Sequence, residues 1–172
     1  MELLLGAGSS RDRRLVVNGR KAWTGLVTLD SNPDHGCDVV HDLNSTPWPF
    51  EDDVFDEVHA YEVLEHLGRQ GDLPSFFAHF WEIYRILKPG GHLCATVPRW
   101  DSMWAWSDPG HTRVISEGTL AFLDQEQYKA QVGVTPMADY RSMWVGDFEC
   151  KWTGRTPDTL RFTLQAVKPP RL

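Results

Sequence analysis

The sequence predicts an α/β domain built on a mostly parallel sheet, with an antiparallel hairpin at its C-terminal end. Two observations lead to this prediction. Short, nearly continuous apolar runs recur within residues 2–98, which is typical of parallel strands that are buried on both faces. Residues 146–168 instead hold two alternating segments around a turn that contains Gly and Pro, the pattern of an antiparallel hairpin. We therefore expect about seven strands in a single domain over residues 1–172.

The apolar runs of strand length cover residues 2–6, 26–30, 37–43, 56–61 and 92–98. Residues 74–87 carry aromatic and aliphatic side chains at three- and four-residue steps, which predicts a helix whose apolar stripe belongs to the core. The Lys-Pro-Gly-Gly turn that follows ends this helix, because proline cannot continue it and glycine adopts the positive φ of a sharp turn. Helix, turn and strand 92–98 thus form a crossover between parallel strands.

Two stretches depart from this regularity. Residues 9–25 offer one short apolar patch that is broken by the turn signal Asn18-Gly19, so the pattern does not favour a full crossover helix there. A long excursion follows the strand 92–98, and within it residues 117–130 predict a helix with Ser116 as its N-cap.

Composition and charge limit the partners of the chain. Hydrophobic residues make up 41% of the 172 positions, and no apolar run approaches the ~20 residues that span a bilayer. The 24 Asp and Glu exceed the 17 Lys and Arg, and the net charge of −7 opposes binding to a phosphate backbone. The dense basic cluster of Arg11, Arg13 and Arg14 is interpreted as solvated surface. We therefore expect neither a membrane nor a nucleic-acid partner.

The cysteines and the first residues favour a cytoplasmic setting. Cys37, Cys94 and Cys150 are odd in number, far apart and without CxxC spacing. The sequence therefore predicts neither a disulfide framework nor a zinc site, and we expect no metal. The apolar start at residues 1–5 lacks a basic leader and a small-residue cleavage site, so it is not expected to be a secretory signal.

A Gly-rich turn and two acids stand where a nucleotide-binding α/β fold needs them. Gly6 and Gly8 follow the first predicted strand, and Asp30 ends the second one about twenty residues later. Such a turn lets the backbone approach a ligand closely, and such an acid can accept hydrogen bonds from ribose hydroxyls. A second acid, Asp42, stands near the end of the third predicted strand. The combination predicts a site shaped for a nucleoside.

Together these segments resemble the class I S-adenosylmethionine-dependent methyltransferases, whose doubly wound sheet is Rossmann-like. The resemblance runs over residues 3–98 and includes LLLGAGSS, VTLD, DVVHDLNSTPWPFEDDVFDEVHAYEVLEHL and EIYRILKPGGHLCATVP. It is greatest to small methyltransferases with a reduced first helix and a DPxH element, here residues 108–111. Two features depart from the family pattern: Ser10 replaces the third glycine, and the chain starts at its first strand without the helix that often covers the cofactor.

The resemblance implies S-adenosylmethionine as the cofactor. The Gly-rich turn would line the methionine and ribose, Asp30 would hold the ribose hydroxyls with Ser31 beside the adenine, and Asp42 would accept from the adenine amino group. Residues at the tip of the fourth strand would face the methionine part. The cofactor-binding residues implied in this way are Gly6, Ala7, Gly8, Asp30, Ser31, Asp42, Leu43, Ala60 and Tyr61.

Methyl transfer from a sulfonium is an in-line displacement with a good leaving group, so positioning and desolvation supply most of the catalysis. An oxygen or nitrogen acceptor must still lose a proton, and histidine is the usual base. The candidate catalytic residues are His66 and His111, although His66 could simply pack and His111 could hold its loop. Glu62 and Glu65 are interpreted as solvated carboxylates at a helix start.

Residues 99–140 are expected to form an insertion that serves as acceptor site or lid. Trp100, Trp104 and Trp106 lie after the carboxyl end of a strand, where α/β folds bind ligands. They could wall the acceptor pocket, form a small additional core or make a homodimer contact. The expected acceptor is a small molecule or is carried on a protein.

Three functions remain to be separated. Methyl transfer to an acceptor other than nucleic acid is favoured, since residues 60–63 (Ala-Tyr-Glu-Val) do not resemble the tetrapeptide of DNA amino-methyltransferases and no Pro-Cys nucleophile is present. The alternative is a methyltransferase-like domain that binds the cofactor or a partner without turnover, as Ser10 and the lack of an N-terminal cover would suit. A nicotinamide-dependent dehydrogenase shares the Gly-rich turn, but Asp42 and the KPGG crossover argue against it.

Overall fold

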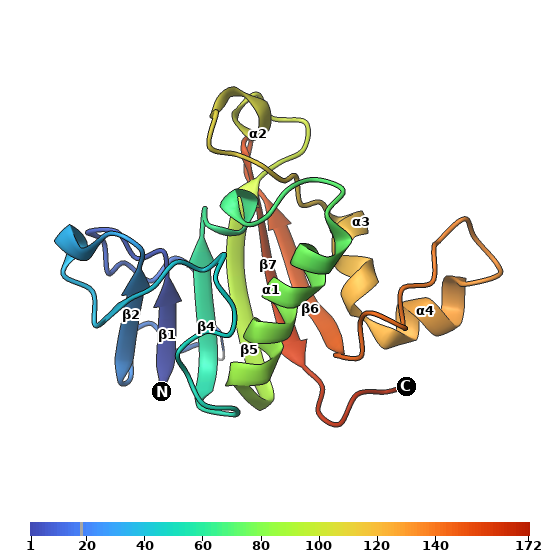
Figure 1. Cartoon of the computed structure of the whole chain (residues 1–172), viewed down its shortest axis with the longest axis horizontal. Helices are drawn as coiled ribbons and strands as arrows, with labels where there is room; N and C mark the ends of the chain where they lie inside the picture. The colour runs from blue at the N-terminus through green and yellow to red at the C-terminus, as the bar shows by residue number, and fades with distance from the viewer. Residues whose placement is uncertain (18) are drawn as a thin grey trace.

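Within residues 1–17 and 19–172, which the computed structural model describes, seven strands form one sheet in the order β3-β2-β1-β4-β5-β7-β6 (Figure 1). The strands from β1 to β5 pair in parallel, whereas β7 runs antiparallel to both β5 and β6. The predicted fold class, including the C-terminal hairpin, is therefore confirmed. The strands are β1 (Glu2–Leu5), β2 (Leu26–Asp30), β3 (Val39–Val40), β4 (Phe55–Tyr61), β5 (Leu87–Pro98), β6 (Phe148–Arg155) and β7 (Thr159–Ala166).

The longest helix, α1 (Leu73–Ile86), confirms the helix predicted between the fourth and fifth strands. Its N-terminus is capped by Asp72, whose side chain accepts a hydrogen bond from the Ser75 N–H at 3.1 Å. The apolar stripe of α1 is buried over the sheet beside β4 and β5 (Figure 1). In the described part of the chain, no helix has the length and apolar character needed to cross a membrane. The other helical elements are η1 (Pro33–His35), η2 (Leu64–His66), α2 (Trp104–Ser107), α3 (Glu117–Leu120), η3 (Ala121–Leu123) and α4 (Gln125–Gln131).

Two predicted elements are shorter than the sequence pattern indicates. The strand predicted over residues 37–43 is reduced to β3, because the Asp38 side chain accepts hydrogen bonds from the backbone N–H and hydroxyl of Thr28 instead of continuing the ladder. The helix predicted over residues 117–130 is divided into α3, η3 and α4, because Asp124 leaves the helical conformation and caps α4. The predicted N-cap of α3 is confirmed, with a full capping box.

Strand β5 is longer than predicted. It begins at Leu87, which pairs with Phe55, and it includes the KPGG turn as an irregularity before regular pairing resumes at His92. The turn is therefore a bulge within the strand and not a separate connection. The predicted turn Asn18-Gly19 includes Asn18, which lies outside the described residues.

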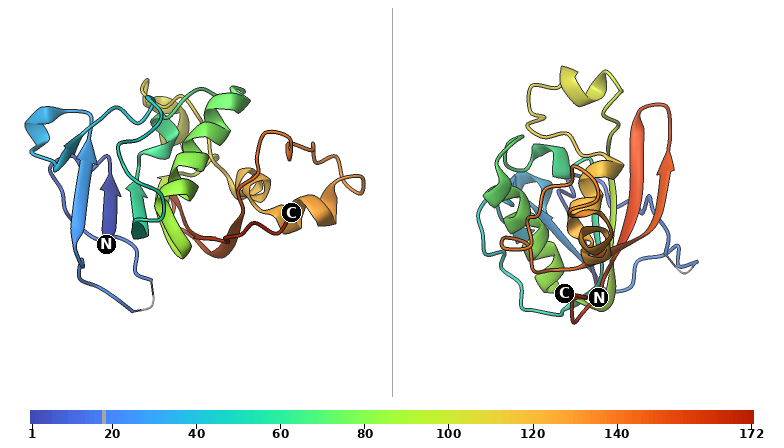
Figure 2. Two further views of the ribbon diagram at one scale, coloured as in Figure 1. Left: turned by 60° about the horizontal axis from the view of Figure 1, so that its bottom comes forward. Right: turned by 90° about the vertical axis from the view of Figure 1, so that its right-hand side faces the viewer.

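The two faces of the sheet are covered differently. Figure 2 shows α1, α3 and α4 on one side, together with most of the hydrophobic core. Over β1 and β4 the opposite face is covered by residues 9–25, whose described part contains neither helix nor strand. This segment contributes Leu15 to a small cluster with Leu4, Tyr61 and Cys94. An irregular segment thus takes the place of a crossover helix on this face.

Strand β1 is the point at which the strand order reverses. The chain moves from β1 outward to β2 and β3, and then crosses back to β4 on the other side of β1. In open α/β sheets, ligands bind at such a switch point, in the crevice outside the carboxyl ends of the strands. Gly6 follows β1 with a φ of +55°, and a Cβ added there would lie 2.5 Å from Val63 Cγ2, which follows β4. Only glycine permits this close approach of the two loops.

Candidate functional site

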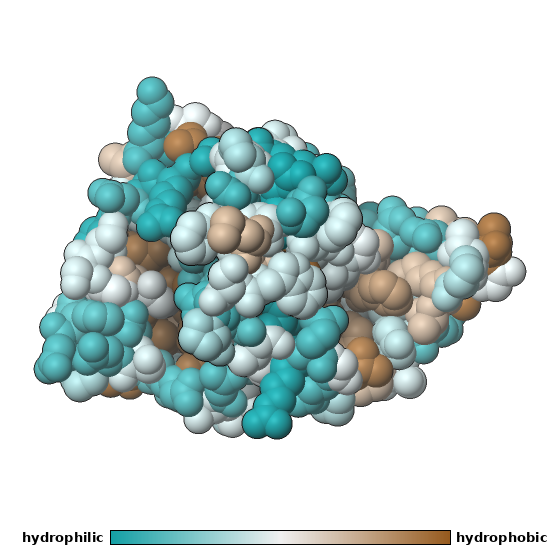
Figure 3. Space-filling view, turned by 90° about the horizontal axis from the view of Figure 1, so that it is seen from above, coloured by the Kyte–Doolittle hydropathy of each residue, from teal (hydrophilic) through white to brown (hydrophobic). Residues whose placement is uncertain are grey.

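A cleft of about 230 Å³ lies at this switch point, between the segments that follow β1, β2, β3 and β4. Figure 3 looks onto this end of the molecule, where hydrophilic residues surround smaller apolar areas. The cleft brings together residues that are far apart in the sequence. The residues assigned to the site from the sequence that line it are Gly6, Asp30, Ser31, Asp42, Leu43 and His66.

The remaining cofactor residues implied by the resemblance lie outside this lining. Gly8 acts through its backbone, since its N–H donates to Asp30. Ala7 and Ala60 are buried, and the Tyr61 hydroxyl on the opposite face of the sheet accepts hydrogen bonds from the backbone of Arg14 and Leu15. Burial raises the pKa of Tyr61 to about 12. Contacts of these residues with a cofactor remain predictions.

Asp30 is held in place as an ionised carboxylate. Its Oδ2 accepts from the Gly8 N–H and its Oδ1 from the Asn32 N–H, each at 2.9 Å, and His35 Nδ1 lies 3.0 Å from Oδ1. Burial by itself raises the pKa of Asp30, but the two N–H groups and His35 outweigh it, so the pKa lies below its usual value. Since a carboxylate has about four acceptor positions, Asp30 can still receive ligand hydroxyls.

The loop after β3 contributes residues that the sequence pattern did not single out. Asp42 Oδ1 accepts from both the backbone N–H and the side-chain amide of Asn44, at 2.9 and 3.3 Å. Asn44 Oδ1 in turn accepts from the Gly68 N–H at 2.9 Å, which ties the loop after β3 to the segment after β4. Glu62 lines the cleft with a φ of +57°, a strained conformation for a residue other than glycine. Only its position after a strand end could have indicated Asn44, whereas Glu62 was named from the sequence, but as a solvated carboxylate and not as part of the cleft.

Both candidate catalytic histidines lie together at the rim of the cleft. The rings of His66 and His111 meet edge to face, with centroids 4.7 Å apart. Glu65 lies beneath them, and its Oε1 is 4.0 Å from His111 Nε2. Burial, with Glu62 and Asp108 as further acids nearby, raises the pKa of Glu65 to about 8. The interpretation of Glu65 as a solvated carboxylate is therefore wrong.

Backbone pairing between distant segments explains why Glu65 is buried. The Glu65 carbonyl accepts hydrogen bonds from the N–H groups of Thr112 and Arg113, at 2.9 and 3.1 Å. The Arg113 guanidinium also donates to the Leu67 carbonyl at 3.1 Å. These bonds clamp the DPGH loop onto the turn after β4, so the loop covers Glu65 and places His111 beside His66.

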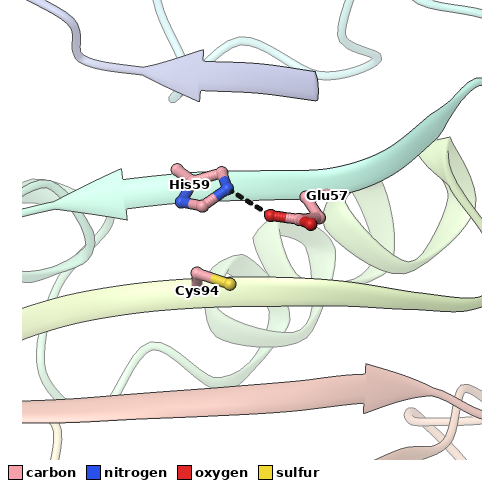
Figure 4. A group of neighbouring side chains, drawn as sticks. All are labelled: Glu57, His59 and Cys94. Atoms are coloured by element: carbon pink, nitrogen blue, oxygen red, sulfur yellow. Dashed lines mark hydrogen bonds and ion pairs between the residues drawn. The ribbon is translucent and has the colours of Figure 1, made fainter. Parts of the chain in front are cut away.

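A second polar cluster lies on the opposite face of β4 and β5. Figure 4 shows Glu57 and His59 projecting from β4 toward Cys94 of β5. His59 uses both ring nitrogens, at 2.9 Å from Glu57 Oε2 and 2.6 Å from the Tyr61 hydroxyl. Burial lowers the pKa of His59 and raises that of Cys94 to about 12.

The negative charge of the carboxylates in this second cluster is compensated by an arginine from the segment that covers it. Arg13 pairs with both Glu2 and Glu57, and all three side chains are buried. The Arg13 guanidinium also stacks over the Trp23 ring, 4.9 Å from its centroid. The interpretation of Arg13 as solvated surface is therefore wrong, and the cluster serves to fix residues 9–25 to the sheet.

The Trp-rich loop stands away from the core. Trp100, Trp104 and Trp106 are all exposed, and the Trp106 indole N–H donates to the Trp100 carbonyl at 3.0 Å. The interpretation of these residues as a small additional core is therefore wrong. Their roles as acceptor wall, lid or dimer contact remain predictions.

Comparison with known proteins agrees with this geometry. A family model described as a methyltransferase domain matches residues 22–95, whereas no curated protein sequence matches the chain. A methyltransferase from Mesorhizobium loti is similar in structure, with a TM-score of 0.56 and 13% identity over 95% of this chain and 90% of that chain. The 1,6-didemethyltoxoflavin-N1-methyltransferase of Burkholderia thailandensis has a TM-score of 0.53 and 16% identity, over 97% and 71% of the two chains. A methyltransferase in complex with the Haloferax volcanii Trm112 activator has a TM-score of 0.53 and 17% identity, over 96% and 82%.

The sheet order and the cleft at its switch point define a Rossmann-like methyltransferase domain. The family match covers the strands from β2 to most of β5, so this part of the chain is similar to a methyltransferase domain. The Mesorhizobium loti neighbour is an S-adenosylmethionine-dependent methyltransferase, and the Burkholderia thailandensis neighbour holds S-adenosylhomocysteine. The match ends before residues 108–111, so the resemblance of that loop to a DPxH element stays a prediction.

Proposed function

We propose that this protein transfers a methyl group from S-adenosylmethionine to a small-molecule or protein-borne acceptor. The observation that carries the proposal is the convergence of Gly6, Asp30 and Asp42 on one cleft at the switch point. The ionised Asp30 has an acceptor position left for a ribose hydroxyl, and Asp42 stands at the side suited to the adenine amino group. A cleft of about 230 Å³ suits the nucleoside half, and the methionine half would extend past Glu62 toward His66.

In this arrangement the methyl group would face the histidines at the rim of the cleft. His66 Nδ1 and His111 Nδ1 each lie 2.9 Å from a backbone carbonyl, which leaves Nε2 of each ring to take a proton from the acceptor. Residues 99–140 would form the acceptor side of the site, with the exposed tryptophans as its wall or lid. Most of the rate enhancement would come from alignment of the acceptor with the carbon–sulfur bond.

Calorimetric titration with S-adenosylmethionine, S-adenosylhomocysteine and NAD tests the proposal. Asp30→Ala should weaken binding of both sulfur compounds by about 10- to 100-fold, since hydrogen bonds to a charged group are worth roughly 1.5–3 kcal/mol. Asp34→Ala is the matched control, because Asp34 is an exposed acid in the same segment that does not line the cleft. Binding of NAD alone, or equal effects of the two substitutions, would contradict the proposal.

Turnover separates an enzyme from a domain that binds the cofactor without reaction. The assay follows S-adenosylhomocysteine release with a panel of hydroxyl and amine acceptors. Formation of a methylated product supports the proposal. Tight cofactor binding with no product from any acceptor class would favour the non-catalytic alternative.

A further inference from the structure

The cluster of Glu65, His66 and His111 beside the cleft has the composition of a metal site. One potential ligand atom from each residue lies within 4.8 Å of those of the other two. Two imidazoles and one carboxylate are a donor set that binds zinc or iron(II) and leaves coordination positions open. We infer that these three residues bind one divalent transition-metal ion.

The state of Glu65 is the independent observation that points to a ligand. Its side chain is only 2% exposed, and neither carboxylate oxygen has a hydrogen-bond partner among the described residues. Burying a carboxylate without donors is costly, so such groups in folded proteins are normally paired or bind metals. A cation between Glu65 and His111 would satisfy both oxygens.

Both histidines are oriented as metal ligands usually are. His66 Nδ1 lies 2.9 Å from the Gly110 carbonyl, and His111 Nδ1 lies 2.9 Å from the Trp104 carbonyl. Because a carbonyl can only accept, each Nδ1 carries the hydrogen and each Nε2 keeps its lone pair. Ligating histidines typically donate their other N–H to a carbonyl or carboxylate in this way, which fixes the ring.

The backbone holds the ligands close to the separation that an ion requires. Glu65 is joined to the residues after His111 by the two hydrogen bonds of its carbonyl. Ligand atoms around a tetrahedral ion at ~2.0–2.2 Å stand roughly 3.3–3.6 Å apart, so the cluster, whose ligand atoms lie within 4.8 Å of one another, must contract by about 1.5 Å at most. Rotation of the side chains can supply a movement of this size.

The cluster of Glu57, His59 and Cys94 offers a contrast within the same protein. One potential ligand atom from each of its residues also lies within 4.8 Å of those of the other two. However, both nitrogens of His59 are hydrogen-bonded and Glu57 is already paired with Arg13. Two of its three members are therefore already engaged, whereas both Glu65 oxygens lack a partner among the described residues, so we assign the ion to the cluster at the cleft.

The position of the ion indicates the class of acceptor, a step that rests on the proposed function. His66 lines the cleft, so an open coordination position would face the methyl group of the cofactor. When Nε2 of both histidines binds the ion, neither ring can act as the base. An acceptor hydroxyl bound there would instead lose its proton to solvent, because a metal ion lowers the pKa of a bound hydroxyl. The resulting oxygen anion forms the bond to the methyl carbon, and the carbon–sulfur bond breaks with its electron pair on sulfur. The site therefore suits an alcohol or phenol acceptor.

Calorimetric titration of the full chain with Zn²⁺, without S-adenosylmethionine, tests the metal site directly. We expect one equivalent of Zn²⁺ in the native protein and a loss of affinity of more than about 100-fold in Glu65→Gln and in His111→Gln. Cys94→Ala and His92→Gln are the controls and should keep one equivalent. S-adenosylhomocysteine binding by the two ligand variants shows whether they remain folded.

The visible and near-ultraviolet spectrum of the native protein loaded with Co²⁺ gives a second readout that needs no variant. Weak visible bands without an intense near-ultraviolet thiolate band support ligation by imidazole and carboxylate. No Zn²⁺ binding, loss of binding in Cys94→Ala alone, or a thiolate band would overturn the inference. Because metal binding and S-adenosylhomocysteine binding are measured separately, either can fail while the other stands.

Discussion

Replacing Arg13 with methionine tests the buried ion network that joins residues 9–25 to the sheet. The Arg13 side chain is 3% exposed and pairs with Glu2 and Glu57, which are also buried. Methionine keeps much of the aliphatic bulk but leaves the two carboxylates without the cation that they share. Removing one partner of a buried pair typically costs about 3–5 kcal/mol. Since Arg20 still reaches Glu2 at 3.4 Å from the surface, we expect a loss of about 3 kcal/mol.

Urea unfolding followed by tryptophan fluorescence and circular dichroism measures this loss. The matched control is the triple variant that combines Arg13→Met with Glu2→Gln and Glu57→Gln, since it removes the unpaired charges together with the cation. Replacing a whole buried ionic group is often close to neutral, so the triple variant should regain most of the stability. A loss below about 1 kcal/mol in Arg13→Met would refute the reasoning, as would a triple variant no more stable than the single one.

Two further predictions concern the Gly-rich turn and the buried histidine. Gly6→Ala should cost about 1–3 kcal/mol of stability and weaken S-adenosylhomocysteine binding, because the new Cβ would lie 2.5 Å from Val63 Cγ2. In Gly8→Ala the new Cβ meets no atom within 4 Å, so this variant should bear only the backbone strain of a φ of +53° and should bind S-adenosylhomocysteine more tightly than Gly6→Ala. Equal calorimetric affinities in the two variants would contradict this account. Burial lowers the pKa of His59 below 6.5 in the folded protein. As the pH drops below about 6.5, His59 therefore binds a proton more readily in the unfolded chain than in the folded one. The free energy of unfolding should fall over this range. His59→Gln should flatten this dependence in urea titrations between about pH 7 and 5, and an unchanged slope would show that His59 does not cause it.

The strands and the main helix could be predicted because local pattern and burial agree. Continuous apolar runs mark strands that are covered on both faces, and the buried apolar residues of α1 recur from Phe76 to Ile86. The break at Asp124 could not be predicted, because it depends partly on Arg171, whose guanidinium reaches Asp124 from the C-terminal end at 3.0 Å. Arg13 was misplaced for a similar reason, since its partners Glu2 and Glu57 come from two other segments.

The candidate site likewise contains residues that could be placed from the sequence and residues that could not. Gly6, Asp30 and Asp42 could be placed from sequence, because the carboxyl ends of parallel strands meet at one edge of the sheet. The burial of Glu65 could not, because it depends on backbone hydrogen bonds to a loop more than forty residues further along the chain. Metal-ligand spacing gave no signal for the same reason, since His111 joins Glu65 and His66 only in the folded chain.

A crystal structure with S-adenosylhomocysteine tests the central claim most directly, because it locates every part of the cofactor at once. The account predicts that a ribose hydroxyl lies within hydrogen-bond distance of Asp30, that the adenine amino group faces Asp42, and that the sulfur points toward His66 and His111. A cofactor bound elsewhere, or a ribose that does not contact Asp30, would contradict it.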